Sequence, residues 1–361
     1  MNIKSLLLGS AAVLVAASTA QAADAIVVEP EPVEYVRICD AYGSGFFYIP
    51  GTETCMRIGG YVRSTYRHYT DTVGGVESND HAVWNYRGRL NILVNNETDW
   101  GTLASYLRIQ GGDASADGDA NAGIDQAWIS ISGFRLGYGE SLWGSNGATG
   151  PSIDDGFFNF DQAIFLEYTY AMDGLALVVG AQDSTGTAAT SESPDYYAGL
   201  RYDADWGFVA AKWIHDSTTA ANPSGETDGD AYSLAAEFNL GDSGWTLGAW
   251  YEADGEDITQ YIGGGSAGSV VDASLADYQW GVQLNGALAD NLSGYVSYSA
   301  MEAVSSSTTF IDATKVAVGL VWTPITGLKI QTEYVSYEGD YVLASEDADY
   351  DAFIVRVTRS W

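Results

Sequence analysis

The feature that most constrains this chain is a regular alternation of apolar and polar side chains within segments of about 8 to 10 residues. Residues 84–95 show the alternation best. One phase of this segment holds Trp84, Tyr86, Leu90, Ile92 and Val94, and the other holds Asn85, Arg87, Arg89, Asn91 and Asn95. Because successive side chains of a strand point to opposite faces, the segment predicts a β-strand with one apolar and one polar face.

Segments of this kind recur along the chain and are joined alternately by tight turns and longer polar stretches. The segments are residues 56–66, 84–94, 103–109, 126–131, 134–138, 164–170, 175–181, 196–202, 209–213, 232–238, 245–251, 278–284, 294–298, 316–322, 328–334 and 353–361. Tight turns are expected at Gly101, Gly133, residues 173–174, 203–207, 241–244, 290–291 and 324–327. The rhythm predicts an all-β fold, a closed antiparallel transmembrane β-barrel of about 16 strands over residues 55–361.

A soluble β-sandwich or propeller is the main structural alternative, since its strands also alternate. The polar phase here carries little of the Lys and Thr that solvated strands use, and the whole chain has only 15 Lys and Arg. Aromatic residues gather at the strand ends, where ordinary β-propensity or a membrane-interface girdle would place them. The membrane barrel accounts for both observations.

The N-terminal residues 1–22 have the pattern of a secretory signal peptide, with Lys4, an apolar run and small residues before a cleavage point after Ala22. That run is too short for a membrane-spanning helix, so we expect any membrane crossing to be made by strands. Residues 23–54 are expected to be a short leader. Cys39 and Cys55 are expected to form one disulfide in an exported protein, and the alternative is a pair of reduced thiols. No metal site is expected.

Charge is strongly negative overall, with a formal net charge of −33, and this excludes nucleic acid as a partner. After the signal peptide the basic residues, in contrast, all lie within or at the ends of the predicted strands except Arg37, and mostly opposite the apolar phase. On a lipid face each would cost roughly 2 to 4 kcal/mol near the bilayer midplane, so they are expected to face the lumen. Five of them, on the first three strands, predict a basic patch on one stretch of wall: Arg57, Arg63, Arg87, Arg89 and Arg108.

Acidic residues are concentrated in the longer loops, and most are expected at a solvated outer rim, where divalent cations could bridge them to lipopolysaccharide. Residues 140–161, after the fifth strand, are different because they are rich in Gly, Phe and Asp. We expect this third loop to fold inward, so that Asp154 and Asp155 face the arginines across the lumen. The acidic loops favour cations as the preferred ions.

Several stretches resemble the porins of alphaproteobacteria, the type known from Brucella and rhizobia. The similarity is closest in residues 23–28, 34–43, 47–55 and 60–63, with weaker similarity at 101–103, 133–137 and 356–361. The resemblance implies an outer-membrane homotrimer of 16-stranded barrels, each with an inward third loop, and passive diffusion of ions and small hydrophilic solutes. Trp361 stands where such barrels usually end in Phe, and the third loop lacks the Pro-Glu-Phe-Gly-Gly motif of enteric porins.

An outer-membrane enzyme would need a positioned base, for which His68, His81 and His215 are available. No Gly-x-Ser-x-Gly, phosphate-binding or metal-ligand motif accompanies them, so we expect neither catalysis nor a cofactor. The remaining alternative is an adhesive or structural barrel with a plugged lumen. The small and polar residues of the inward phase favour a water-filled channel instead.

Overall fold

The computed structural model describes residues 36–73, 76–112, 122–143, 150–153, 162–183, 194–217, 229–254, 262, 276–303, 312–341 and 346–361. The chain divides into two units, Met1–Arg37 and Ile38–Trp361. Within the described residues every helix and strand belongs to the second unit, which is described by itself below. The predicted signal peptide and residues 23–35 of the predicted leader lie outside the described residues, so both stay predictions.

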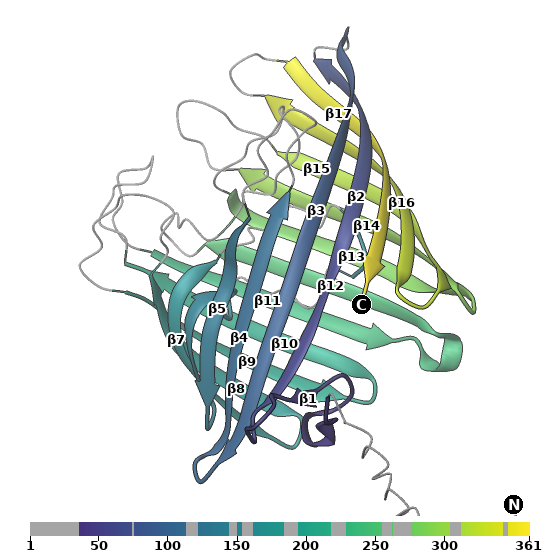
Figure 1. Cartoon of the computed structure of the whole chain (residues 1–361). Coiled ribbons are helices and arrows are strands. Elements are labelled where there is room, and N and C mark those ends of the chain that lie inside the picture. Colours follow the sequence, from purple (N-terminus) through teal and green to yellow (C-terminus); the bar gives the residue numbers. More distant parts are fainter. Residues whose placement is uncertain are drawn as a thin grey trace, which may run out of the picture. The chain divides into compact units, whose positions relative to one another are not determined.

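The described part of the second unit consists of strands and two short 3₁₀ helices, and Figure 1 shows their arrangement. The helices are η1 (Asp40–Tyr42) and η2 (Gly241–Ser243). The strands are β1 (Phe47–Tyr48), β2 (Cys55–Val73), β3 (Val76–Thr98), β4 (Gly101–Gly112), β5 (Gly123–Ile131), β6 (Phe134–Gly139), β7 (Ala163–Met172), β8 (Leu175–Asp183), β9 (Asp195–Ala204), β10 (Gly207–Asp216), β11 (Gly229–Asn239), β12 (Trp245–Asp254), β13 (Ala276–Ala289), β14 (Leu292–Ala303), β15 (Ala313–Ile325), β16 (Leu328–Tyr341) and β17 (Glu346–Ser360). In the described part of the chain no helix is long and apolar enough to cross a membrane.

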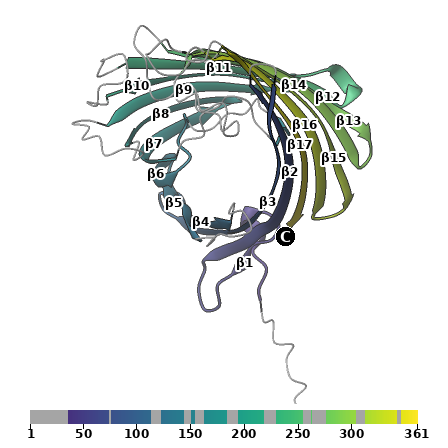
Figure 2. The ribbon, with the colours of Figure 1, turned by 90° about the horizontal axis from the view of Figure 1, so that it is seen from above.

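The sixteen strands from β2 to β17 close into a ring, seen end-on in Figure 2. Each pairs with the next in antiparallel register, and β17 pairs with β2 from Ala348 opposite Val73 to Ser360 opposite Tyr61. The two-residue β1 pairs with the start of β2, and its Phe47 also forms a β-bridge with Ile38. The predicted 16-stranded closed barrel is confirmed.

The backbone angles of two tight turns explain why the chain reverses at Gly133 and at residues 173–174, as predicted from the sequence. Ser132 and Gly133 both have positive φ (52° and 86°), as do Asp173 and Gly174 (48° and 82°). Two successive residues with positive φ are the requirement of a type I′ turn, whose twist matches that of the strands it joins. The sequence therefore sets the register of β5 with β6 and of β7 with β8 through turn chemistry.

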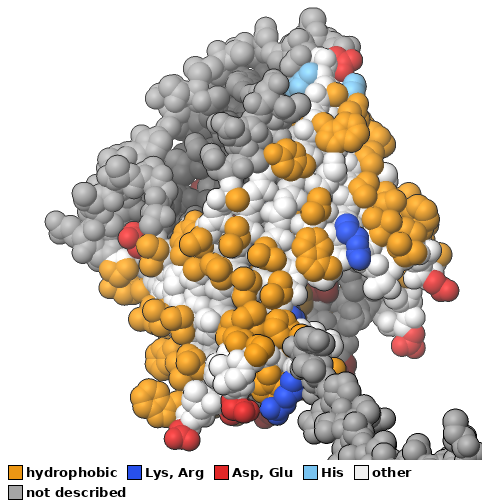
Figure 3. Space-filling view, viewed as in Figure 1, with side chains coloured by type: hydrophobic (Ala, Val, Ile, Leu, Met, Phe, Trp, Pro, Cys, Tyr) orange, Lys and Arg blue, Asp and Glu red, His pale blue; other side chains and the backbone are white. Residues whose placement is uncertain are grey.

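The apolar phase faces outward. Val62, Leu166, Val179 and Val318 are between 46% and 58% exposed, although they sit in the middle of regular sheet. Figure 3 shows hydrophobic side chains spread over the outer face, while the visible acidic side chains lie near strand ends. A continuous exposed apolar band around a closed barrel is the surface that contacts lipid.

The opposite phase faces the lumen and is largely polar. Its buried polar and charged residues include Arg108, Gln126, Glu167, Lys212, Glu252, Gln279, Gln283, Lys315, Gln331 and Glu333. Such residues are stable on the inside of a barrel because they remain hydrated or bond one another. The alternation therefore separates a lipid-facing surface from an aqueous one, as predicted.

The first two strands of the barrel extend well beyond the predicted 56–66 and 84–94. β2 reaches Val73 and β3 begins at Val76, with pairs such as His68 opposite Ala82 and Thr70 opposite Asp80 continuing the ladder. Outside the lipid layer an outward side chain no longer has to be apolar, so the alternation stops while the backbone hydrogen bonds continue. Alternation therefore marks the lipid-facing part of a strand rather than its full length.

Residues 38–54 pack against the start of the barrel. Cys39 and Cys55 form the predicted disulfide, and with Phe46 they make a buried apolar cluster against which Leu93 packs. The Tyr42 hydroxyl donates to Glu97 Oε2 at 3.3 Å. Partial burial, followed by the negative charge of Glu97, raises the pKa of the Tyr42 hydroxyl. The disulfide to Cys55 and the hydrogen bond from Tyr42 to Glu97 thus hold the N-terminal segment against the barrel.

Candidate pore constriction

A strip of cations crosses the inner face where the barrel closes. Arg63 on β2 is directly opposite Arg87 on β3, and on its other side it is opposite Thr358 of β17. Lys329 on β16 is opposite the same Thr358, and Arg356 lies two residues before Thr358. The charges of Arg63 and Arg356 both act on the Lys329 ammonium. Four neighbouring strands therefore bring Lys329, Arg356, Arg63 and Arg87 together, and we call this set the basic strip.

Two members of the basic strip were absent from the patch predicted on the first three strands. Arg356 and Lys329 belong to the last two strands, and only the pairing of β17 with β2 places them beside Arg63. The signal that could have located them is their inward phase in a barrel that is closed. In a closed barrel the last strand pairs with the first, as well as each strand with the next one in sequence. Treating the first and last strands as neighbours would have placed Arg356 and Lys329 beside Arg63.

Arg89 extends the strip along β3. Its Nε donates to Gln110 Oε1 at 2.7 Å, and its guanidinium lies 5.0 Å from the ring centroid of Tyr61. The positive charges of Arg87 and Arg108 both act on it. Arg89 thus remains part of the cationic wall, held in place by an amide and an aromatic ring.

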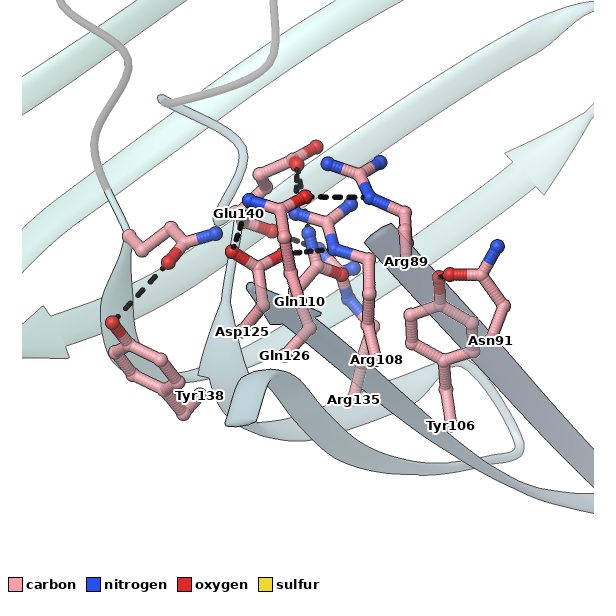
Figure 4. Close-up of polar contacts among 11 residues, drawn as sticks. Arg89, Asn91, Tyr106, Arg108, Gln110, Asp125, Gln126, Arg135, Tyr138 and Glu140 are labelled. Carbon is pink, nitrogen blue, oxygen red and sulfur yellow. Dashed lines mark hydrogen bonds and ion pairs between the residues drawn. The ribbon is translucent and has the colours of Figure 1, made fainter. Parts of the chain in front are cut away.

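Arg108 has a different environment from its neighbours. Its Nε is paired with Asp125 Oδ2, and its Nη2 donates to Glu140 Oε1 at 2.9 Å. Gln126 Nε2 also donates to Glu140, at 2.7 Å. Figure 4 shows Arg108, Asp125 and Glu140 pointing toward one another, with Gln126 beside them. Arg108 is therefore neutralised by carboxylates and fixes the residue at which the third loop begins.

Arg57 lies apart from the strip. Six residues along β2 separate it from Arg63, a distance of roughly 20 Å at the rise of a strand. Its guanidinium lies 4.9 Å from the ring centroid of Phe46, which belongs to the disulfide-closed segment. Arg57 is thus associated with the N-terminal segment.

The third loop is attached to strands far around the ring. Ser152 Oγ and the Ile153 backbone N–H both donate to Glu333 Oε2 on β16, at 2.7 and 2.8 Å. The same oxygen accepts from the Tyr295 hydroxyl of β14 at 2.5 Å. Gln331 Nε2 donates to the Pro151 carbonyl oxygen. Glu333 is 1% exposed, so its carboxylate is sealed by the residues it binds.

A second attachment lies nearer the start of the loop. Lys212 Nζ of β10 donates to the Trp143 carbonyl oxygen at 3.2 Å, and Leu142 packs beside Gly199 of β9. β6, from which the loop leaves, and β14 are eight places apart in a ring of sixteen, so they lie on opposite sides. The described loop residues therefore contact inward-facing side chains on widely separated strands. Asp154 and Asp155 lie outside the described residues.

The three histidines have neighbours of their own. His68 Nε2 is 2.9 Å from Asp80 Oδ1, His215 Nδ1 is 3.0 Å from Asp230 Oδ1, and His81 stacks on Tyr69. Within the described ranges, no three His, Cys, Asp or Glu residues lie close enough to hold a metal ion.

Comparisons with known proteins agree with the barrel and its aqueous inner face. A family described as a porin subfamily matches residues 24–353. Porin Omp2a of Brucella ovis is 41% identical over 249 residues, which are 60% of this chain and 71% of that protein. Porin Omp2b of Brucella suis is 39% identical over 244 residues, 60% of this chain and 67% of that protein.

Solved structures share the fold at low sequence identity. The outer membrane channel DcaP of Acinetobacter baumannii has a TM-score of 0.70 at 15% identity, covering 87% of this chain and 99% of that one. The anion-selective porin from Comamonas acidovorans has a TM-score of 0.59 at 13% identity, covering 86% and 100%. The family match, which spans most of the sequence, shows that this chain belongs to the porin subfamily.

Proposed function

We propose that ions and small hydrophilic solutes diffuse through this outer-membrane porin past a constriction formed between the basic strip and the third loop. The observation that carries the proposal is the register of β2 with β3, which sets Arg63 directly opposite Arg87. Like charges directly opposite each other destabilise a sheet. Their placement on the inner wall is explained if a water-filled pore hydrates them and uses their field.

The third loop supplies the other side of the constriction in this proposal. Its attachments to Glu333 and Lys212 support a position inside the ring. Asp154 and Asp155 directly follow the attached Ile153 in the sequence, and in this proposal they face the basic strip. Ions would cross a transverse field between the two sides, which orients polar solutes and selects by charge.

The predicted constriction residues divide into three roles. Arg63, Arg87 and Arg89 stay in the cationic wall, and Lys329 and Arg356 are added to it. Arg108 acts through Glu140 as a positioning residue for the loop. Arg57 acts, with Phe46, at the N-terminal segment.

Export, assembly and surface contacts belong to the same proposal. The chain would leave the cytoplasm through a signal peptide cleaved after Ala22 and assemble as a homotrimer, as the resemblance to alphaproteobacterial porins implies. Its acidic loops would bind lipopolysaccharide through divalent cations. Cross-linking of the purified protein measures the oligomer, and N-terminal sequencing measures the cleavage point.

Two arginines on the same strand, β17, allow a matched test of the constriction. Arg356 faces the lumen on β17, whereas Arg359 of the same strand pairs with outward-facing Val62. In planar bilayers with a salt gradient, Arg356→Gln should shift the reversal potential toward cations. Arg359→Gln should leave it unchanged. Equal shifts in the two variants, or none in Arg356→Gln, would contradict the proposal.

A further inference from the structure

One part of the lumen wall is apolar. The inner faces of β8, β10 and β11 carry Ala176, Val178, Phe208, Ala210 and Ala235 side by side. Their neighbours along the strands are the outward, lipid-facing residues, such as Leu177 and Val209. Exposing apolar surface to water costs free energy in proportion to its area. Covering this apolar stretch of the lumen wall would therefore be favourable.

The third loop turns this apolar stretch into a cavity. Leu142 lies over β9 at Gly199, where a Cβ atom would come within 2.5 Å of a Leu142 methyl carbon. Glycine at position 199 therefore leaves the room that Leu142 occupies. Wall and loop together enclose about 320 Å³, a volume that fits a small organic molecule.

Cationic side chains line the same cavity. The Arg201 guanidinium lies 3.7 Å from the ring centroid of Phe208. Lys212 also lines the cavity. Arg201 donates to Asp203 through Nε and Nη2, at 2.8 and 2.6 Å. Within the described residues the Arg201 Nη1 has no hydrogen-bond acceptor. This nitrogen can therefore donate to the carboxylate oxygen of a ligand.

We propose that this cavity is a binding subsite for organic anions that join an apolar ring or short chain to a carboxylate. The apolar part lies against Phe208, Val178 and the alanines beneath Leu142, and the carboxylate meets Arg201. The subsite rests on the proposed function in one respect, because its ligand arrives through the pore. It lies on β8 to β11, away from the basic strip on β16, β17, β2 and β3.

Three probes separate the two parts of such a ligand. Benzoate carries both the ring and the carboxylate, acetate only the carboxylate, and benzyl alcohol only the ring. Added to the full-length protein in planar bilayers, benzoate should reduce single-channel current saturably. The half-blocking concentration of benzoate should be at least about tenfold lower than that of acetate or benzyl alcohol. Each of these two probes lacks one of the groups that the cavity would bind.

Two variants test the site itself, and one serves as the control. Ala176→Leu fills the cavity and should raise the half-blocking concentration of benzoate at least about tenfold. Ala181→Leu adds the same methyl groups on the outward phase of the same strand and should change nothing. Arg201→Gln should weaken benzoate while leaving benzyl alcohol as in the wild type.

The outcomes decide between the subsite and the constriction separately. Open channels that benzoate blocks no better than acetate overturn the subsite, while the reversal-potential test of Arg356 still stands. Equal benzoate block in wild type and Arg201→Gln also overturns it, even if Ala176→Leu fails to fold. Isothermal titration of benzoate into the detergent-solubilised protein should give the same order of affinities without requiring a current.

Discussion

Replacing Glu333 with alanine should release the third loop from the far wall. The Glu333 carboxylate accepts two hydrogen bonds from the loop, from Ser152 Oγ and the Ile153 N–H. Hydrogen bonds to a charged group contribute about 1.5 to 3 kcal/mol each, so the attachment loses roughly 3 to 6 kcal/mol. At 1.4 kcal/mol per factor of ten, the ratio of attached to detached loop falls by about 10² to 10⁴.

Glu333→Gln is the graded version of the same change. Its side-chain oxygen still accepts, but neutral hydrogen bonds contribute only about 0.5 to 1.5 kcal/mol each. The loss is then roughly 2 kcal/mol, or about 30-fold in the same ratio. The β15–β16–β17 ladder involves backbone groups alone, so both variants should keep the barrel.

Single-channel recording in symmetric salt measures the consequence. Glu333→Ala should show a larger mean conductance, more current noise and weaker ion selectivity than the wild type, with Glu333→Gln between them. Glu237→Ala, which removes an inward carboxylate that no described loop residue contacts, should conduct like the wild type. If Glu333→Ala gives wild-type conductance and noise, the loop does not depend on this attachment and the reasoning fails.

Three other changes have defined outcomes. Arg108→Gln leaves the partly buried Asp125 and Glu140 without their cation, which should cost about 3 to 5 kcal/mol and lower the midpoint of urea unfolding. Removing the disulfide, whose cysteines are 16 residues apart, by Cys39→Ser with Cys55→Ser should cost the N-terminal segment about 3 kcal/mol and expose residues 40–54 to protease while the barrel stays resistant. Val318→Arg places a charge on the lipid face and should destabilise the barrel by about 2 to 4 kcal/mol in vesicle-based unfolding, whereas Val318→Thr should not.

The repeating parts of this molecule could be predicted from sequence because short-range rules determine them. Period-two alternation gives the two faces of each strand, and pairs such as Ser132–Gly133 determine where strands reverse. The barrel fold and its strand number follow from rules of this kind, whereas the disulfide was expected because an exported chain has two cysteines. Strand ends beyond the lipid layer do not, because backbone pairing continues there without any apolar requirement.

The residues of the proposed constriction were less predictable because they meet across long sequence separations. Ser152 and Glu333 are 181 residues apart, and no local pattern distinguishes Glu333 from another inward carboxylate. Arg108 has the inward phase of a wall cation, yet Glu140 and Asp125 neutralise it. Phase assigns a side chain to the lumen, whereas its partners depend on which strands become neighbours.

The pairing of β17 with β2 also bears on how the channel comes into being. The cations of the inner wall are drawn from both extremes of the chain, Arg63 and Arg87 from the first strands and Arg356 and Lys329 from the last. The pairs β2–β3 and β16–β17 each carry two of these cations, and the pairing of β17 with β2 brings the two pairs together. The complete basic strip therefore depends on closure of the barrel, since only the pairing of β17 with β2 joins its two halves.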